Sequence, residues 1–176
     1  MKAKFIYEVM GDVLKGKSEE DILSSLKNTN LKPDNLLVIS SRKDFLLGVK
    51  KALEMGADVH AADDAALRWT SLNGNLDMVE FLLKNGADVH AEDDFALRYT
   101  SRYGHLDVIE LLLKNGADVH AKDDLALQWA SGNGHLDVVE FLLNNGADVH
   151  AYNDFALRSA LEKSHLNVVD LLKKYM

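Results

Sequence analysis

The stretch GADVHAEDDFALRYTSRYGHLDVIELLLKN runs from Gly86 to Asn115, and closely similar stretches precede and follow it at intervals of 30 residues. Two residue types mark the register most clearly: Asp34, Asp64, Asp94, Asp124 and Asp154, and Leu37, Leu67, Leu97, Leu127 and Leu157. A fixed period of this size is typical of a repeat array. The sequence therefore predicts five units, at 34–63, 64–93, 94–123, 124–153 and 154–176.

Each unit has the pattern of two short helices. In the second unit the first helix is predicted at about 65–72, where Asp64 is expected to cap its free N–H groups. Gly74 and its copies end that helix, because glycine tolerates the positive φ of a helix terminus. The segment GADVHA and the two acidic residues after it are short and polar, which predicts a loop or a short hairpin.

The second helix of each unit carries an apolar stripe. In the second unit this stripe consists of Leu76, Val79, Leu82 and Leu83. The spacing is that of one buried helix face. One helix pair has too little partner surface to bury its own apolar face, so the units are expected to stack on one another.

The two ends of the array differ from its middle. Residues 1–33 are predicted to form a helical N-terminal cap, since residues 5–14 carry apolar side chains at helical spacing. Val38 replaces an arginine of later units, which suggests an apolar cover such as this cap. Lys173 replaces a leucine of earlier units, as expected for a face that no further unit covers. Leu161 replaces a serine, and the sequence offers no reason for that change.

The composition excludes several classes of protein. The 176 residues include no cysteine, which rules out disulfides, thiolate metal sites and cysteine nucleophiles. No apolar run approaches the roughly 20 residues that span a bilayer. The first ten residues lack the apolar core of a signal peptide. The sequence thus predicts a cytoplasmic protein with no membrane partner.

The net charge of −8 is concentrated in the middle of the chain. Residues 56–145 carry six basic and sixteen acidic side chains, whereas residues 1–55 carry ten basic and eight acidic ones. An acidic segment repels phosphates, so nucleic acid is not an expected partner. It favours basic partners, or it serves solubility alone.

The seven histidines follow the repeat and give no sign of catalysis. They occupy two columns: His60, His90, His120 and His150, and His105, His135 and His165. A catalytic histidine should break the repeat, so hydrogen bonding within turns and between neighbouring units is the expected role. Packed helices hold such a column too far apart for an easy zinc site. No enzyme activity, metal, cofactor or small-molecule substrate is expected, since no other catalytic motif is present.

The repeated motifs GHLDVVEFLL (134–143) and NGADVHA (145–151) resemble those of ankyrin repeats. The resemblance covers about residues 34–176 and implies an all-α fold, an ankyrin-repeat α-solenoid. It also implies a non-catalytic protein-binding scaffold, whose partners dock on the fingers and the first helices. The family's T-P-L-H motif is replaced here by AALR and its copies. The period is 30 instead of about 33, so shorter fingers are expected.

Short repeats of this kind are similar to those of large DNA viruses. An engineered version of such a scaffold is the alternative origin that the sequence leaves open.

The positions that change between units predict the binding surface. In the second unit they are 65, 69, 72 and 73, which share one face of the first helix. Aromatic and arginine side chains, which are enriched in binding hot spots, gather at these positions and their copies. The predicted partner-binding residues are Trp69, Leu72, Phe95, Tyr99, Arg102, Tyr103, Leu125 and Trp129.

Two alternatives stay open for this surface. Trp69, Tyr99 and Trp129 share one column, so they can instead be structural residues that pack between units. The same surface can also pair with itself, which would make the protein a self-assembling homo-oligomer, either a dimer or a trimer.

Overall fold

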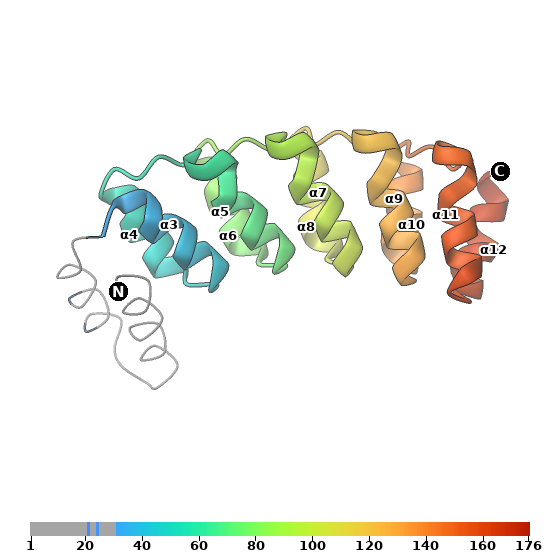
Figure 1. Cartoon of the computed structure of the whole chain (residues 1–176), viewed down its shortest axis with the longest axis horizontal. Coiled ribbons are helices and arrows are strands. Elements are labelled where there is room, and N and C mark those ends of the chain that lie inside the picture. The colour runs from blue at the N-terminus through green and yellow to red at the C-terminus, as the bar shows by residue number, and fades with distance from the viewer. Residues whose placement is uncertain (1–20, 22–23, 25–30) are drawn as a thin grey trace. The chain divides into compact units, whose positions relative to one another are not determined.

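The structure is a computed structural model that describes residues 21, 24 and 31–176. It divides into two compact units, residues 1–66 and 67–176. Every regular element within 31–176 is a helix, as Figure 1 shows. The predicted N-terminal cap lies outside the described residues except for 21, 24 and 31–33. Among the described helices, none combines the length and apolar character needed to cross a bilayer.

Among its described residues, the first compact unit (1–66) contains one complete helix pair. Helix α3 (Pro33–Arg42) packs against α4 (Leu46–Glu54). Proline suits the first position of α3, because a helix leaves that N–H group unbonded in any case. Leu37 and Val49 are fully buried in this pair. The chain turns between the helices at Asp44, whose φ of 54° is left-handed.

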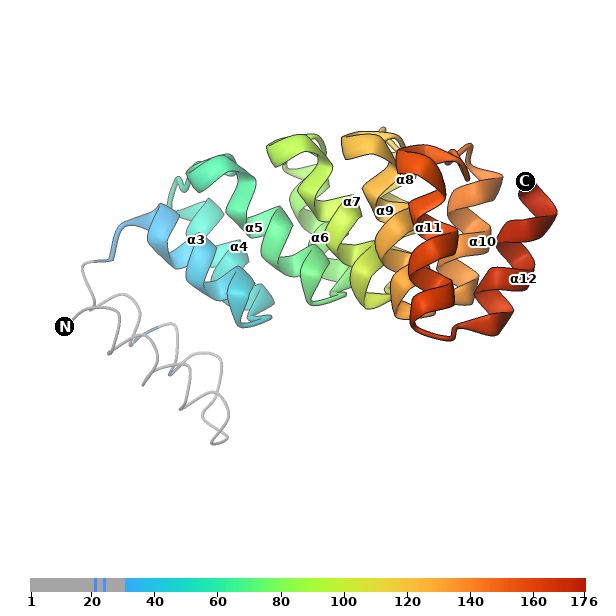
Figure 2. The ribbon, with the colours of Figure 1, turned by 45° about the vertical axis from the view of Figure 1, so that its right-hand side comes forward.

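The second compact unit (67–176) is a two-layered stack of helix pairs. Helix α5 spans the boundary between the units, and the remaining helices follow it in order: α5 (Ala61–Leu72), α6 (Leu76–Lys84), α7 (Ala91–Tyr103), α8 (Leu106–Lys114), α9 (Ala121–Asn133), α10 (Leu136–Asn144), α11 (Ala151–Glu162) and α12 (Leu166–Tyr175). Helices α7, α9 and α11 form one layer, and α6, α8, α10 and α12 form the other (Figure 2). The predicted α-solenoid of helix pairs is confirmed.

The apolar stripe of the second helices forms the core, with one correction. Val79 and Leu82 are fully buried as predicted, but Leu76 is 37% exposed. Leu76 is the first residue of α6 and lies outside the buried stripe. Met78, which is fully buried, completes the stripe in its place.

The predicted loop between units is a left-handed turn. Near the start of α5, α7, α9 and α11, three consecutive residues have φ values of 50° to 58°: Ala62 to Asp64, Glu92 to Asp94, Lys122 to Asp124, and Tyr152 to Asp154. This conformation costs most side chains about 1 kcal/mol or more, and aspartate and asparagine tolerate it best. The turn is the short finger that the 30-residue period predicted.

An arginine of the following helix closes this turn. Arg98 donates from Nε to the carbonyl of Asp93 at 2.8 Å and from Nη2 to the carbonyl of Glu92 at 2.7 Å. Arg158 repeats both bonds in its own unit. Helix α3 instead follows Lys32 in extended backbone, with no left-handed turn to close. This is one reason for Val38, where the repeats with Arg68, Arg98 and Arg158 have arginine; the apolar cover that the sequence suggested lies outside the described residues.

The predicted capping role of the repeated aspartates is wrong for Asp94 and Asp124. The Asp94 carboxylate accepts from Nδ1 of His90 at 3.2 Å and from the backbone N–H of Asp118 in the next unit at 2.8 Å. Asp124 makes the same two contacts one unit later. Because their own backbone is left-handed, these residues lack the extended conformation that an N-cap requires. Their carboxylates instead link consecutive units.

The other histidine column also links consecutive units, as predicted. His135 donates from Nε2 to the carbonyl of Arg102 at 3.0 Å. Its ring lies against Gly104, whose φ is 80°, and a Cβ added to this glycine would lie 2.6 Å from His135 Nδ1. Gly104 is therefore required both by the backbone and by the histidine that packs on it.

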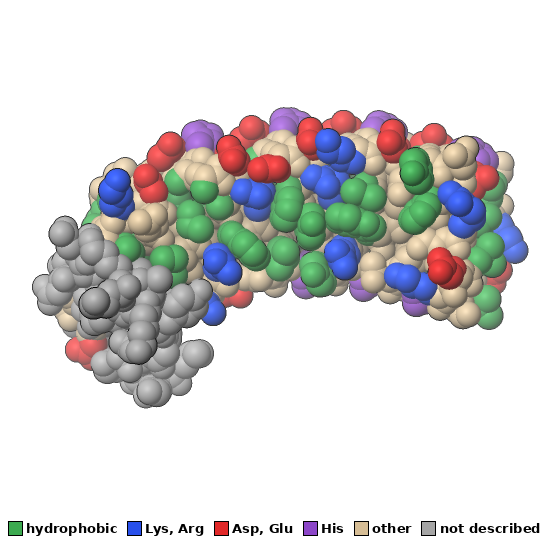
Figure 3. All heavy atoms as spheres, viewed as in Figure 1, with side chains coloured by type: hydrophobic (Ala, Val, Ile, Leu, Met, Phe, Trp, Pro, Cys, Tyr) green, Lys and Arg blue, Asp and Glu red, His purple; other side chains and the backbone are tan. Residues whose placement is uncertain are grey.

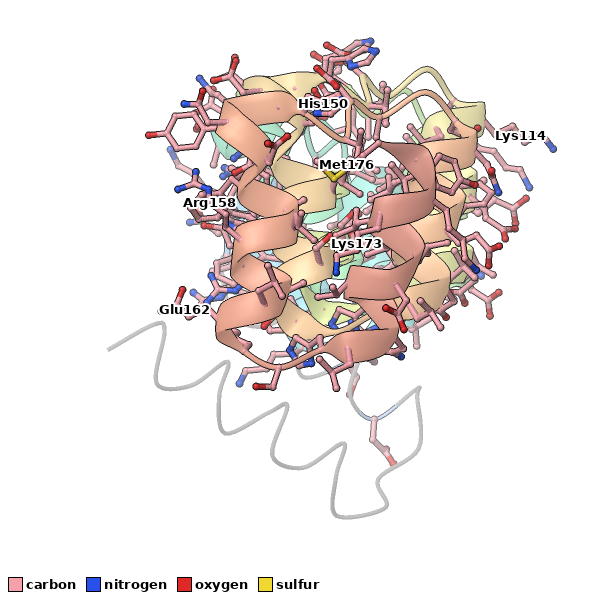
Figure 4. All side chains as sticks on the ribbon, turned by 90° about the vertical axis from the view of Figure 1, so that its right-hand side faces the viewer. Lys114, His150, Arg158, Glu162, Lys173 and Met176 are labelled. Carbon is pink, nitrogen blue, oxygen red and sulfur yellow. The ribbon has the colours of Figure 1, made fainter. Side chains whose placement is uncertain are left out.

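Two departures from the repeat are exposed in the structure. Lys173 is exposed, on the end of the stack that Figure 4 views. Ser101 is fully buried in α7, whereas Leu161, its counterpart in α11, is 48% exposed. Within the structure, close packing therefore does not restrict the side chain at either position.

Candidate functional site

The eight predicted binding residues form what we call the first-helix face. Arg102 and Tyr103 are exposed, and the other six side chains are partly buried: Trp69, Leu72, Phe95, Tyr99, Leu125 and Trp129. Figure 3 shows hydrophobic and basic side chains intermixed over α7 and α9, with acidic and histidine side chains along the turns. Two side chains of the first-helix face are thus accessible to a partner, while the other six also pack against neighbouring residues.

An aromatic chain runs through the centre of this face. The rings of Phe95 and Tyr99 stack with centroids 3.9 Å apart and an interplanar angle of 14°. Tyr99 meets the ring of Trp129 edge to face, at 4.9 Å. Since Trp129 belongs to the next unit, this contact is structural as well as exposed. Aromatic pairs in these geometries contribute about 0.5–1.5 kcal/mol beyond the area that they bury.

Arg102 lies beside two aromatic rings. Its Cζ is 5.5 Å from the ring centroid of Trp129 and 5.9 Å from that of Tyr103. A guanidinium at such distances is attracted to the ring face. The two contacts hold the charge of Arg102 over the boundary between α7 and α9.

Two further arginines, which the sequence did not single out, complete the aromatic chain. Cζ of Arg68 lies 5.2 Å from the ring centroid of Phe95, and Cζ of Arg98 lies 5.9 Å from it. The recurrence of arginine at 68, 98 and 158 was the available signal. It was interpreted only as part of the repeat frame.

The last unit carries a smaller version of this arrangement. Arg158 Cζ lies 5.4 Å from the ring centroid of Phe155, and Tyr152 meets the same ring at 5.8 Å. Phe155 occupies the same column as Phe95, which was the signal in the sequence. The arginine and aromatic side chains therefore continue onto α11.

The turns that border the face contain a charge pair between units. Lys122 Nζ lies 2.7 Å from a carboxylate oxygen of Asp93. This hydrogen bond and the positive charge of Lys122 lower the pKa of Asp93. The charge of Asp93 is thereby balanced within the turns.

The described residues hold no group of three histidine or acidic side chains that could bind a metal ion. The face contains arginine donors, aromatic surface and hydroxyl groups. Aromatic and arginine side chains are the types that are enriched among the residues contributing most to binding at protein interfaces.

The comparisons with known proteins agree with the repeat and the helix pairs. The family described as ankyrin repeats (3 copies) matches residues 36–123 and 122–176. Among curated proteins, none matches the chain.

Proposed function

The chain belongs to the ankyrin repeat family, and on that basis we propose that it binds a protein partner through the first-helix face. Ankyrin repeats are generally protein–protein interaction modules, so the coarse function follows from the family. The observation that supports this surface is the aromatic chain from Phe95 to Trp129, with Arg102 beside it. Partly exposed aromatic rings and arginines are the side chains that contribute most to binding free energy.

The proposed role involves binding alone and no catalysis. The protein acts as a non-catalytic scaffold that needs no cofactor, metal or small-molecule substrate. Its partner is a protein, since the acidic turns and the net charge of −8 oppose nucleic acid.

Self-association through the same face is the alternative. Its support is the partly exposed apolar surface, which a second copy would cover as well as a foreign protein. Absolute mass by light scattering separates the two functions. A mass near 19.6 kDa across micromolar concentrations favours a foreign partner, and a dimer or trimer favours self-assembly.

The experiment that tests the face itself is a peptide selection. Random dodecapeptides displayed on phage are selected on the full chain, and the recovered peptides are synthesised with a fluorescent label. We expect Tyr103→Ala to weaken their binding about tenfold or more, since aromatic hot spots contribute about 2 kcal/mol or more. The matched control is Lys114→Ala in the other helix layer, which is exposed and should leave binding unchanged. Equal affinities for both variants would contradict the proposal.

A further inference from the structure

Beyond the acidic left-handed turns at their starts, the first helices have a charge opposite to that of the whole chain. The segments that follow these turns, at 67–73, 95–103, 125–133 and 155–163, carry five basic side chains and one acidic one. The second helices carry seven acidic and four basic side chains. The average charge of residues 56–145 favours basic partners or serves solubility alone, but the acidic groups of this segment lie on the turns and the second helices. The first-helix face itself is basic.

Arg102 provides an open site for a negative group. In the part of the chain that the structure describes, the Arg102 guanidinium contacts the rings of Tyr103 and Trp129 but makes no hydrogen bond or ion pair, and only the backbone carbonyl of this residue accepts a bond, from His135. Its guanidinium has five N–H donors and is always charged. A planar carboxylate can take two of these donors at once, which makes such pairs strong and directional. Neighbouring rings reduce the access of water and so strengthen the pair.

The other arginines add fixed positive charge to the same surface. Arg98 and Arg158 each donate two hydrogen bonds to carbonyls of their turns. A carbonyl is neutral, so these bonds hold the arginine in place without cancelling its charge. A surface whose charges are already positioned loses less entropy when it binds a charged partner.

The acidic turns define where such a partner can lie. Glu92 and Asp123 are exposed in the left-handed turns at the starts of α7 and α9, whereas Arg102 lies in the last turn of α7. The separation is roughly two helical turns, or about 12 Å along the axis. This distance exceeds the screening length of about 8 Å at physiological salt. A negative group at Arg102 is therefore little affected by the acidic turns.

We infer that the occupant of the first-helix face is an acidic peptide segment, one of whose carboxylates pairs with Arg102 while apolar side chains contact Tyr99 and Trp129. This inference rests on the proposed function and specifies its partner. A peptide fits better than a nucleic acid, because a continuous line of phosphates would also meet the acidic turns. A few carboxylates interleaved with apolar side chains match arginines that alternate with aromatic rings.

The test uses the peptides selected on the full chain, together with the variants Arg102→Gln and Arg102→Lys. The Arg102 side chain is exposed and makes no hydrogen bond, and its backbone carbonyl keeps the bond from His135 in either variant, so both variants should fold, which circular dichroism can check. Lys114→Gln removes the same charge from the other layer and serves as the control. We expect the selected peptides to be rich in Asp and Glu, and Arg102→Gln to weaken them about tenfold. Replacing the peptide's acidic residues by Gln or Asn should remove the difference between wild type and Arg102→Gln.

The Arg102→Lys variant separates the effect of charge from that of paired hydrogen bonding, because lysine keeps the charge but loses the planar pair of donors. An intermediate affinity supports the carboxylate pairing. Neutral or basic peptides that depend on Tyr103 but not on Arg102 would overturn the acidic inference and leave the proposed face standing. Peptides that depend on neither residue would overturn both. Tighter binding of a labelled deoxythymidine dodecamer than of any selected peptide would also overturn the inference.

Discussion

Helices α7 and α9 differ from each other far more than α8 and α10 do. Residues 106–114 and 136–144, the two second helices, differ at three of nine positions, whereas 95–103 and 125–133 differ at six of nine. In the second helices the shared positions include most of the fully buried core residues, such as Leu112 and Leu142, and the buried pair that differs, Ile109 and Val139, stays apolar. In the first helices the differences include the exposed Arg102 and Tyr103. The repeat therefore keeps its packing constant and varies one outward surface.

This difference separates stability from recognition. A substitution in the constant core should unfold the stack, while a substitution on the first-helix face should change binding alone. The two roles overlap at Tyr99 and Trp129, whose edge-to-face contact joins two units. Arg102 and Tyr103 are exposed, so substitutions there should change binding with little effect on stability.

The largest change in the free energy of unfolding is expected for a substitution in the buried core of the second helices. Leu112→Ala in α8 should lower the free energy of unfolding by about 2–5 kcal/mol, because Leu112 is fully buried and the change leaves a cavity. Tyr103→Ala, at a side chain 49% exposed, should lower it by no more than about 0.5 kcal/mol. Urea denaturation measures both. Similar losses for the two variants would show that the first-helix face is core.

A smaller effect is expected where the constant turn meets the next unit. Gly104→Ala should destabilise the protein by about 2–3 kcal/mol, since alanine is disfavoured at a φ of 80° and its Cβ would collide with His135. Gly116→Ala is the matched control: its φ is 98°, but no atom lies within 4 Å of an added Cβ. It should cost only about 1 kcal/mol from the backbone. Equal losses in thermal or urea unfolding would mean that the histidine contact contributes nothing.

At the varied positions of the left-handed turn, a change to glycine should stabilise the protein. Glu92 has a φ of 54°, so Glu92→Gly should remove backbone strain and stabilise the protein by up to about 1 kcal/mol. Glu110→Gly, in the middle of α8, should destabilise it by about 1 kcal/mol instead. The same substitution thus has opposite signs at two exposed glutamates. A loss of stability for Glu92→Gly would contradict the left-handed turn.

The smallest effect on stability is expected for the charge pair between Lys122 and Asp93 in the turns. Lys122 lowers the pKa of Asp93, so the carboxylate should titrate below the ordinary aspartate value, and Lys122→Gln should raise its pKa. Because the folded-state pKa is the lower one, the pair contributes at pH values above the unfolded pKa. Its contribution is lost as the pH falls through the folded pKa. Carbon NMR of the carboxyl group measures both values, and an unchanged pKa in Lys122→Gln would disprove the pairing.

Much of the fold was predictable because its signals are local and repeated. The period, the helix pairs and Gly104 follow from apolar spacing and from the special conformations of glycine. The left-handed turn was not predictable. Its first position is occupied in turn by Ala62, Glu92, Lys122 and Tyr152, which share no preference for positive φ. An aspartate before a helix is also usually a cap, and only the structure shows that Asp94 bonds to the next unit instead.

The candidate face was predictable as a set of varied positions, but its chemistry was not. The sequence indicates that Tyr99 and Arg102 lie on one side of a helix. It does not reveal that Arg68 and Arg98 reach the ring of Phe95, because those contacts depend on side-chain paths within and between units. The average charge of the segment also concealed the basic character of this face, since the acidic groups lie on other surfaces.

The most direct test of the first-helix face is an NMR titration of the isotopically labelled chain with a selected peptide. The account predicts that the signals of Tyr99, Arg102 and Tyr103 shift on binding, while those of Asp107 and Glu110 at the exposed surface of α8 do not. Shifts confined to α8 and α10, with α7 and α9 unchanged, would contradict it.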